Sequence, residues 1–174
     1  VYFMVNKGII KATHDLKTLT VKNWSELLAN APTKQKVMGT ALIGNNIYIS
    51  ATDSPSRIIV INKTNLTLLA EVNATSLNLT GAVPTVFAIG STLYGLTSDN
   101  QLHKLKFEAN ALFIEATYEI NGLSLDYSNR LKISTTSDGF VLVSSPTANT
   151  LFSATDLELM WSLSNTVRYF GCFA

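Results

Sequence analysis

The chain has 174 residues, and 13 Lys and Arg against 12 Asp and Glu leave a formal net charge of +1. This balance provides no long-range electrostatic field for nucleic acid or an anionic membrane, so neither is expected as a partner. Only 14% of the residues are charged, against about a quarter in ordinary globular proteins. Asn, Ser and Thr replace them, a composition typical of secreted or self-assembling proteins and equally of strand-rich chains.

Two further counts narrow the class of protein. The sequence contains no run of 18 apolar residues, so we expect no membrane insertion. Cys172 is the only cysteine, which excludes a disulfide within the chain, and its apolar neighbours predict a small buried hydrophobic residue.

Short apolar segments bounded by Asn, Asp, Gly, Ser and Pro recur along the whole chain, which is the pattern of strands joined by turns. In chain order, the predicted strands cover residues 1–5, 8–12, 19–24, 41–44, 46–50, 57–61, 67–72, 87–90, 92–96, 101–105, 113–118, 139–143, 150–154, 159–163 and 168–173. The chain is therefore predicted to be all-β.

The strands form a repeat with a period of about 46 residues. Val1, Ile47 and Leu93 follow one another at intervals of 46, and Phe140 follows Leu93 by 47. The predicted units and a last, closing strand cover residues 1–38, 39–82, 83–129, 130–165 and 166–174. Because no unit of four short strands can bury its apolar faces alone, the units are expected to stack side by side in one domain spanning residues 1–174.

Four strands at this period resemble the blades of the β-propeller superfamily. Ala154, Asp156 and Trp161 resemble a quinoprotein-type blade ending, whereas the Gly-His and Trp-Asp signatures of WD40 repeats are missing. The resemblance implies an all-β propeller of about four four-stranded antiparallel blades. Strand 166–174 either completes the first blade of a closed four-bladed ring, or the chain is a segment of a larger propeller. A β-sandwich or a β-solenoid remains the alternative fold.

The residues point to no particular chemistry. His14 and His103 occupy different positions of the repeat, and no His, Cys or acidic cluster has the spacing of a zinc or calcium site. Neither a nucleophile elbow nor a phosphate-binding loop occurs. We therefore predict no metal, no cofactor and no catalytic residue, and we expect a protein that is not an enzyme.

Loops between the second and third strands, together with the loops that join successive units, are expected to gather on one face of the propeller. If a ligand binds, this face is where we expect it. The candidate ligand-binding residues are Asp53, Arg57, Asp99, Asn100, Asp126, Tyr127, Arg130 and Arg168.

Five Asn-x-Ser/Thr sequons predict acceptor sites for N-glycosylation in a secreted eukaryotic protein. Their asparagines are Asn23, Asn62, Asn65, Asn73 and Asn78. The last four crowd around the fourth strand of the second unit and the loop that follows it.

These features predict a non-enzymatic binding or assembly module, extracellular or at the cell surface, that presents loops on a rigid propeller. Its partner would be a protein, a glycan or another copy of the chain. The alternative is a glycan-active hydrolase or lyase at the mouth of the propeller channel, with carboxylates from Asp53, Asp99 and Asp126. A quinoprotein-like redox domain would rest on fold analogy alone.

Overall fold

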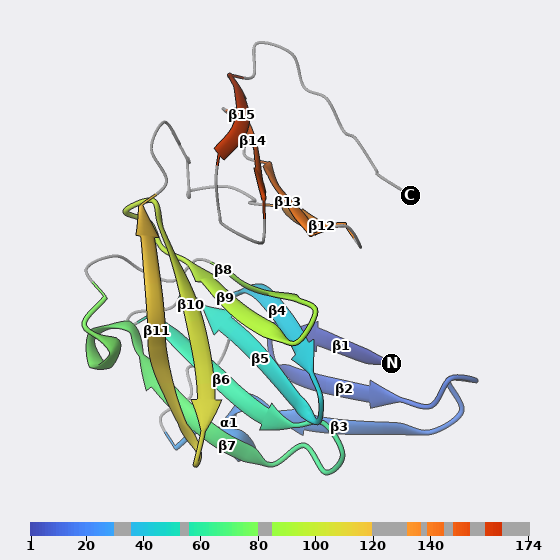
Figure 1. Cartoon of the computed structure of the whole chain (residues 1–174). Helices are drawn as coiled ribbons and strands as arrows, with labels where there is room; N and C mark the ends of the chain where they lie inside the picture. Colours follow the sequence, from blue (N-terminus) through green and yellow to red (C-terminus); the bar gives the residue numbers. More distant parts are fainter. Residues whose placement is uncertain are drawn as a thin grey trace.

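The structure is a computed structural model that describes residues 1–29, 36–52, 56–79, 85–119, 132–136, 139–144, 148–153 and 159–164. Within these residues the chain forms antiparallel sheets in which sequential strands are neighbours (Figure 1). We number the sheets in chain order, as the first to the fourth sheet.

The first sheet has three described strands, and the other three sheets have four each. The first sheet contains β1 (Tyr2–Val5), β2 (Gly8–Ala12) and β3 (Leu19–Asn23), followed by helix α1 (Trp24–Leu27). The second contains β4 (Val37–Ile43), β5 (Asn46–Ala51), β6 (Arg57–Asn62) and β7 (Leu68–Asn73), followed by the short 3-10 helix η1 (Ala74–Leu77). The third contains β8 (Thr85–Ile89), β9 (Thr92–Leu96), β10 (Gln101–Glu108) and β11 (Ala111–Glu119). The fourth contains β12 (Lys132–Thr135), β13 (Phe140–Ser144), β14 (Ala148–Ser153) and β15 (Leu159–Ser164).

Turn chemistry sets where the first two strands of a sheet meet. Gly44 joins β4 to β5 and Gly90 joins β8 to β9, and both have φ of +56°. That left-handed conformation costs glycine little, because it has no Cβ. The two glycines are 46 residues apart, so the same turn recurs at the same place in the repeat.

The hydrophobic core consists of separate layers between adjacent sheets. Side chains alternate across each strand, so β5 directs Ile47 and Ile49 toward the first sheet and Tyr48 toward the third. A first cluster therefore joins the first and second sheets, a second joins the second and third, and a last one joins the third and fourth. Each sheet depends on its neighbours for burial, as the repeat predicted.

Tyr2, Tyr48 and Tyr94 fix the equivalence of the first three sheets. They lie 46 residues apart, in β1, β5 and β9, and each packs into the layer that faces the following sheet. The equivalence predicted for the fourth sheet is wrong by one residue. Val141, not Phe140, faces the preceding sheet as Leu93 does, because neighbouring residues of a strand point to opposite faces and a shift of one residue exchanges those faces.

The strand predicted for residues 19–24 ends one residue early. Asn23 is the last residue of β3, and Trp24 begins α1. The Trp24 side chain is buried between the first and second sheets, and its ring Nε1 donates to the Val5 carbonyl at 3.2 Å. A strand would have placed this side chain on the sheet surface, whereas the helix carries it into the layer between sheets.

Candidate binding groove

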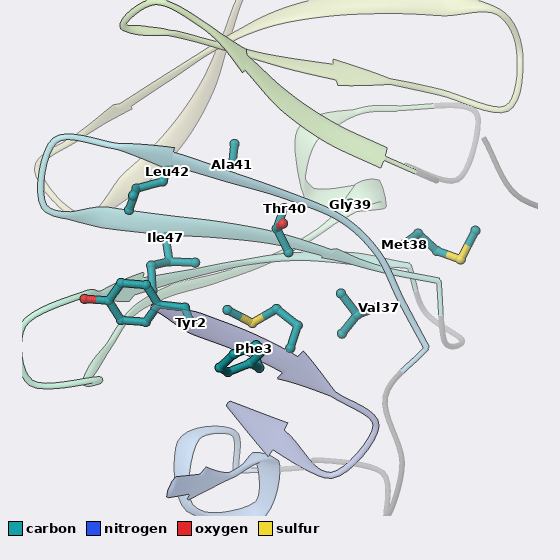
Figure 2. A pocket seen from close by; sticks show the side chains of 10 residues that line it. Tyr2, Phe3, Val37, Met38, Gly39, Thr40, Ala41, Leu42 and Ile47 are labelled. Carbon is teal, nitrogen blue, oxygen red and sulfur yellow. The ribbon is translucent and has the colours of Figure 1, made fainter. Parts of the chain in front are cut away.

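A groove of about 610 Å³ lies between β1 of the first sheet and β4 of the second (Figure 2). In Figure 2, Tyr2 lies on the β1 side, and Leu42 and Ile47 lie on the side of the second sheet. The lining residues are Tyr2, Phe3, Met4, Val37, Met38, Gly39, Thr40, Ala41, Leu42 and Ile47. The groove is therefore lined by two extended strands from adjacent sheets.

One edge of β1 borders the groove and pairs with no strand in the described part of the chain. On its other edge, Val1 and Ala12 exchange two backbone hydrogen bonds of 2.8 and 2.9 Å. Because such bonded pairs alternate along an antiparallel ladder, the N–H and C=O groups of Tyr2 and Met4 point toward the groove. These backbone groups form a template for another strand.

The opposite wall, on β4, is apolar and partly uncovered. The Leu42 side chain is 52% exposed on a strand whose other face is packed against the third sheet. Toward the third sheet, β4 meets β8 so closely that a Cβ on Gly39 would lie 2.2 Å from Thr85 Oγ1 and 2.7 Å from the Val86 nitrogen. The first strands of the second and third sheets thus pack tightly against each other. The first sheet has no described strand at the equivalent position beside β1, and the groove lies there.

The groove is almost free of formal charge. Its lining contains no Asp, Glu, Lys, Arg or His, and the Tyr2 hydroxyl donates to the Lys63 carbonyl at 3.0 Å. An apolar wall beside unpaired backbone groups suits an extended, uncharged polypeptide segment. The side chains that line the groove include no carboxylate, imidazole, amine or thiol.

Arg57, one of the predicted ligand-binding residues, is 6% exposed at the start of β6. Its Nη1 donates to Glu71 on β7, and its Nε has no hydrogen-bond partner among the described residues. The guanidinium therefore contributes to the layer between the first and second sheets, and its predicted ligand role remains a prediction.

Asp99 and Asn100 lie in the turn between β9 and β10, at the end of the third sheet equivalent to the start of β6. Asn100 has φ of 62° and donates its backbone N–H to the Thr97 carbonyl at 3.1 Å. Turn formation accounts for both residue types at this position. The other predicted ligand-binding residues lie outside the described residues: Asp53, Asp126, Tyr127, Arg130 and Arg168. Of the three carboxylates of the hydrolase alternative, only Asp99 is described.

His103, which the sequence gave no reason to single out, is buried between two threonines on its own sheet. Its Nε2 lies 3.3 Å from Thr97 Oγ1, and its Nδ1 lies 2.9 Å from Thr117 Oγ1. Burial lowers the pKa of His103 from its ordinary value of 6.5, and the negative charge of Asp99 partly opposes this effect. The threonine hydroxyls satisfy both ring nitrogens of the neutral imidazole.

The sequon asparagines lie at strand ends. Asn23 and Asn73 are equivalent, since each ends the fourth strand of its unit and precedes a short helix. Asn62 and Asn65 lie at the β6–β7 turn, and Asn78 follows η1. The four clustered sequons therefore divide between the two ends of β7.

Two kinds of feature are absent from the described residues. No group of three or more His, Cys, Asp and Glu there is placed to hold a metal ion. No helix among them is long and apolar enough to cross a membrane.

Comparison with known proteins gives a match in fold only. No family model and no curated protein matches the chain. The β-propeller domain of Cps50 (Swd1) from Myceliophthora thermophila aligns with 91% of this chain at a TM-score of 0.54 and 13% identity. The dihydro-heme d1 dehydrogenase NirN aligns with 95% at 0.64 and 14%, and BamB from Moraxella catarrhalis with 93% at 0.46 and 12%.

The likenesses to the Swd1 domain and to NirN, together with the stacked four-stranded sheets, show an all-β propeller architecture. The chain spans 53% of the Swd1 domain, 34% of the NirN chain and 60% of the BamB chain. Identities of 13% and 14% to the Swd1 domain and NirN indicate the fold and nothing of these proteins' activities.

Proposed function

We propose that this chain is a non-enzymatic binding and assembly module that takes up an extended polypeptide segment in the groove between β1 and β4. The segment adds to the first sheet as an antiparallel strand. Its backbone pairs with Tyr2 and Met4, and its apolar side chains cover Leu42 and Ile47. This mode of recognition obtains affinity from main-chain hydrogen bonds and specificity from alternate side chains.

The observation that carries the proposal is the unpaired edge of β1 beside an exposed apolar wall. Each of the other three sheets has a first strand paired with its second, as β4 with β5 and β8 with β9. The other sheets therefore define the shape of the open position beside β1, the direction of a strand that occupies it and the hydrogen bonds that this strand makes. A polypeptide strand satisfies all three requirements, and a glycan would leave the apolar wall uncovered.

A labelled peptide that copies residues 83–90, the first strand of the third sheet with its flanks, tests the proposal by fluorescence anisotropy. We expect saturable binding that a scrambled peptide lacks. Leu42→Asp should weaken the binding by about tenfold or more, because a carboxylate would be buried without a partner. Leu68→Asp, on the exposed surface of β7, is the matched control and should bind normally. Equal binding of both variants or of the scrambled peptide would refute the proposal.

The same proposal places the module outside the cell or at its surface, with glycans on sequon asparagines. The exposed Asn65 in the β6–β7 turn and the exposed Asn23 before α1 support accessible acceptors. Expressed in a eukaryotic secretory system, the protein should lose mass on enzymatic removal of N-glycans, and Asn65→Gln should reduce that loss. Secreted protein that loses no mass in this treatment would contradict the glycoprotein part of the proposal. It would not bear on the proposal that the groove binds a polypeptide.

A further inference from the structure

Tyr2, at the edge of the groove, is one of three equivalent tyrosines whose ring contacts differ. Tyr48 lies edge-to-face with Phe107 of the third sheet, with ring centroids 6.0 Å apart and an interplanar angle of 81°. Tyr94 stacks on Phe87 of its own sheet, at 5.6 Å and 19°. Among the described residues, no ring contacts Tyr2 in either way. Within this part of the chain, Tyr2 is therefore without the aromatic neighbour that both of its equivalents have.

The two aromatic neighbours come from two different positions of the repeat. Phe87 lies on the first strand of its sheet, opposite Tyr94 in the β8–β9 register. The same first-strand position opposite Tyr48 holds Ala41, and there the following sheet supplies the ring of Phe107 instead. Each of these tyrosines thus has one ring beside it, either from the strand opposite or from the following sheet.

For Tyr2, the position in the following sheet is occupied by Lys63. Lys63 precedes Phe107 by 44 residues, the same interval that separates the bulges of β6 and β10. The Tyr2 hydroxyl donates to the Lys63 carbonyl at 3.0 Å, so Tyr2 extends toward the same part of the following sheet as Tyr48 does. The Lys63 side chain is held on its own sheet, because its Nζ donates to the Gly44 carbonyl at 2.6 Å. At this position the second sheet therefore supplies no ring.

The groove has room for a ring at the remaining position, on the strand opposite Tyr2. Its volume of about 610 Å³ is bordered by Tyr2 and by the apolar side chains of Leu42 and Ile47, which Figure 2 shows at the same end of the groove. Leu42 is 52% exposed, so a ring placed there would remove apolar surface of the wall from water. An aromatic side chain buries more area than an aliphatic one and gains further from stacking.

We propose that the groove selects polypeptide segments that carry an aromatic side chain opposite Tyr2. This inference rests on the proposed function and names the class of segment that the groove takes up. In an antiparallel strand added to β1, the ring stacks on Tyr2 as Phe87 stacks on Tyr94, and it covers Leu42. The rest of the segment binds through its backbone and is tolerant of sequence, so the aromatic residue carries the specificity.

Variants of the labelled peptide of residues 83–90 test this selection without altering the protein. In the register of the third sheet, Phe87 of the peptide lies opposite Tyr2. Phe87→Ala in the peptide should weaken binding by about tenfold or more, because the stacked ring and the apolar area that it buries are lost. Phe87→Leu keeps most of the apolar area without the stacking and should weaken binding by about threefold. Val86→Ala in the peptide is the matched control and should bind nearly as well as the unchanged peptide, because Val86 points to the opposite face of the strand.

A reciprocal change in the protein tests the cause of the selection. Lys63→Phe places a ring at the position of Phe107, where it should pack on Tyr2 and remove the need for a ring in the peptide. The difference in affinity between the unchanged and the Phe87→Ala peptide should then decrease from about tenfold to about twofold or less. Lys63→Gln, which removes the charge and adds no ring, is the control and should keep the full difference.

The outcomes separate this inference from the proposed function. Equal binding of the unchanged and the Phe87→Ala peptide by the unmodified protein would overturn the aromatic selection and keep the groove as a binding site. Binding of none of the peptides would remove the proposed function together with this inference. A tenfold difference that Lys63→Phe leaves unchanged would overturn the assignment of the selection to the open space beside Tyr2.

Discussion

The first and second sheets are built from the same repeat, yet they differ in how much of each is covered. In the second sheet, β6 is buried along five of its six residues and has a packed sheet on either side. Among the described residues, the equivalent β2 contacts a sheet on one side, and Ile10 on its other face is partly exposed. The comparison teaches that neighbouring sheets, more than strand sequence, decide burial in a stacked architecture. The candidate groove lies beside the first sheet, where no described strand covers β1.

The largest effect should separate Ile59 from Ile10. Ile59→Ala removes side-chain volume from a fully buried layer, and we expect a loss of about 2–5 kcal/mol in the free energy of unfolding. Ile10→Ala at the equivalent position should cost less than half as much. Urea unfolding of both variants measures the difference. Equal losses would break the comparison between the two sheets.

The next effect concerns the close contact of first strands. Gly39→Ala places a Cβ against the backbone of Val86, so β4 and β8 have to separate, at a cost of about 1–3 kcal/mol. Gly44→Asn is the matched control, because nothing lies within 4 Å of that position and Asn tolerates its positive φ. Thermal unfolding of both variants would contradict this account if Gly44→Asn proved the more destabilising.

The buried ion pair distinguishes the second sheet further. Arg57 and Glu71 occupy the positions held by Gly8 and Val21 in the first sheet. Glu71→Gln leaves the guanidinium buried beside a neutral amide, and we expect a loss of about 1–2 kcal/mol, discounted because Glu71 is 27% exposed. Glu115→Gln, in an exposed pair with Lys104, is the control and should be nearly neutral in denaturant unfolding.

The smallest effect is the pH dependence that His103 confers on the third sheet. The pKa of His103 is lowered by burial, so the unfolded chain binds a proton more readily than the folded one. Stability from this group is therefore complete above about pH 6.5 and decreases as pH falls below that value. It levels off below the folded pKa. His103→Gln should flatten this part of the stability profile, and an unchanged profile would show that another group titrates there.

Local pattern predicted most of the fold. Short apolar segments bounded by turn residues identify the strands, and the recurrence of Val1, Ile47 and Leu93 at intervals of 46 identifies the units. Gly44 and Gly90, predicted as the last residues of two strands, instead form the turns that follow β4 and β8. The register at Phe140 could not be predicted in the same way, because one extra residue in a turn shifts the spacing without altering composition. Trp24 was assigned to a strand since its helix is a single turn, stabilised by a tertiary contact of its ring.

The groove depends on contacts between sheets that the sequence does not display. Leu42 looks like any strand residue, and only the position of β1 relative to β4 reveals that nothing among the described residues covers it. The pairing of Arg57 with Glu71 is hidden likewise, because the two residues are 14 positions apart and meet through the β6–β7 register. Of the predicted ligand-binding residues, Arg57, Asp99 and Asn100 lie in the described part of the chain.

Amide hydrogen exchange at Tyr2 and Met4, followed by NMR, tests the central claim most directly. Both amides should exchange rapidly in the free protein and become protected when the peptide of residues 83–90 is added at saturation, while Phe3, already bonded to β2, changes little. Continued rapid exchange of Tyr2 and Met4 at saturating peptide would contradict the account, because no strand would then have added to β1.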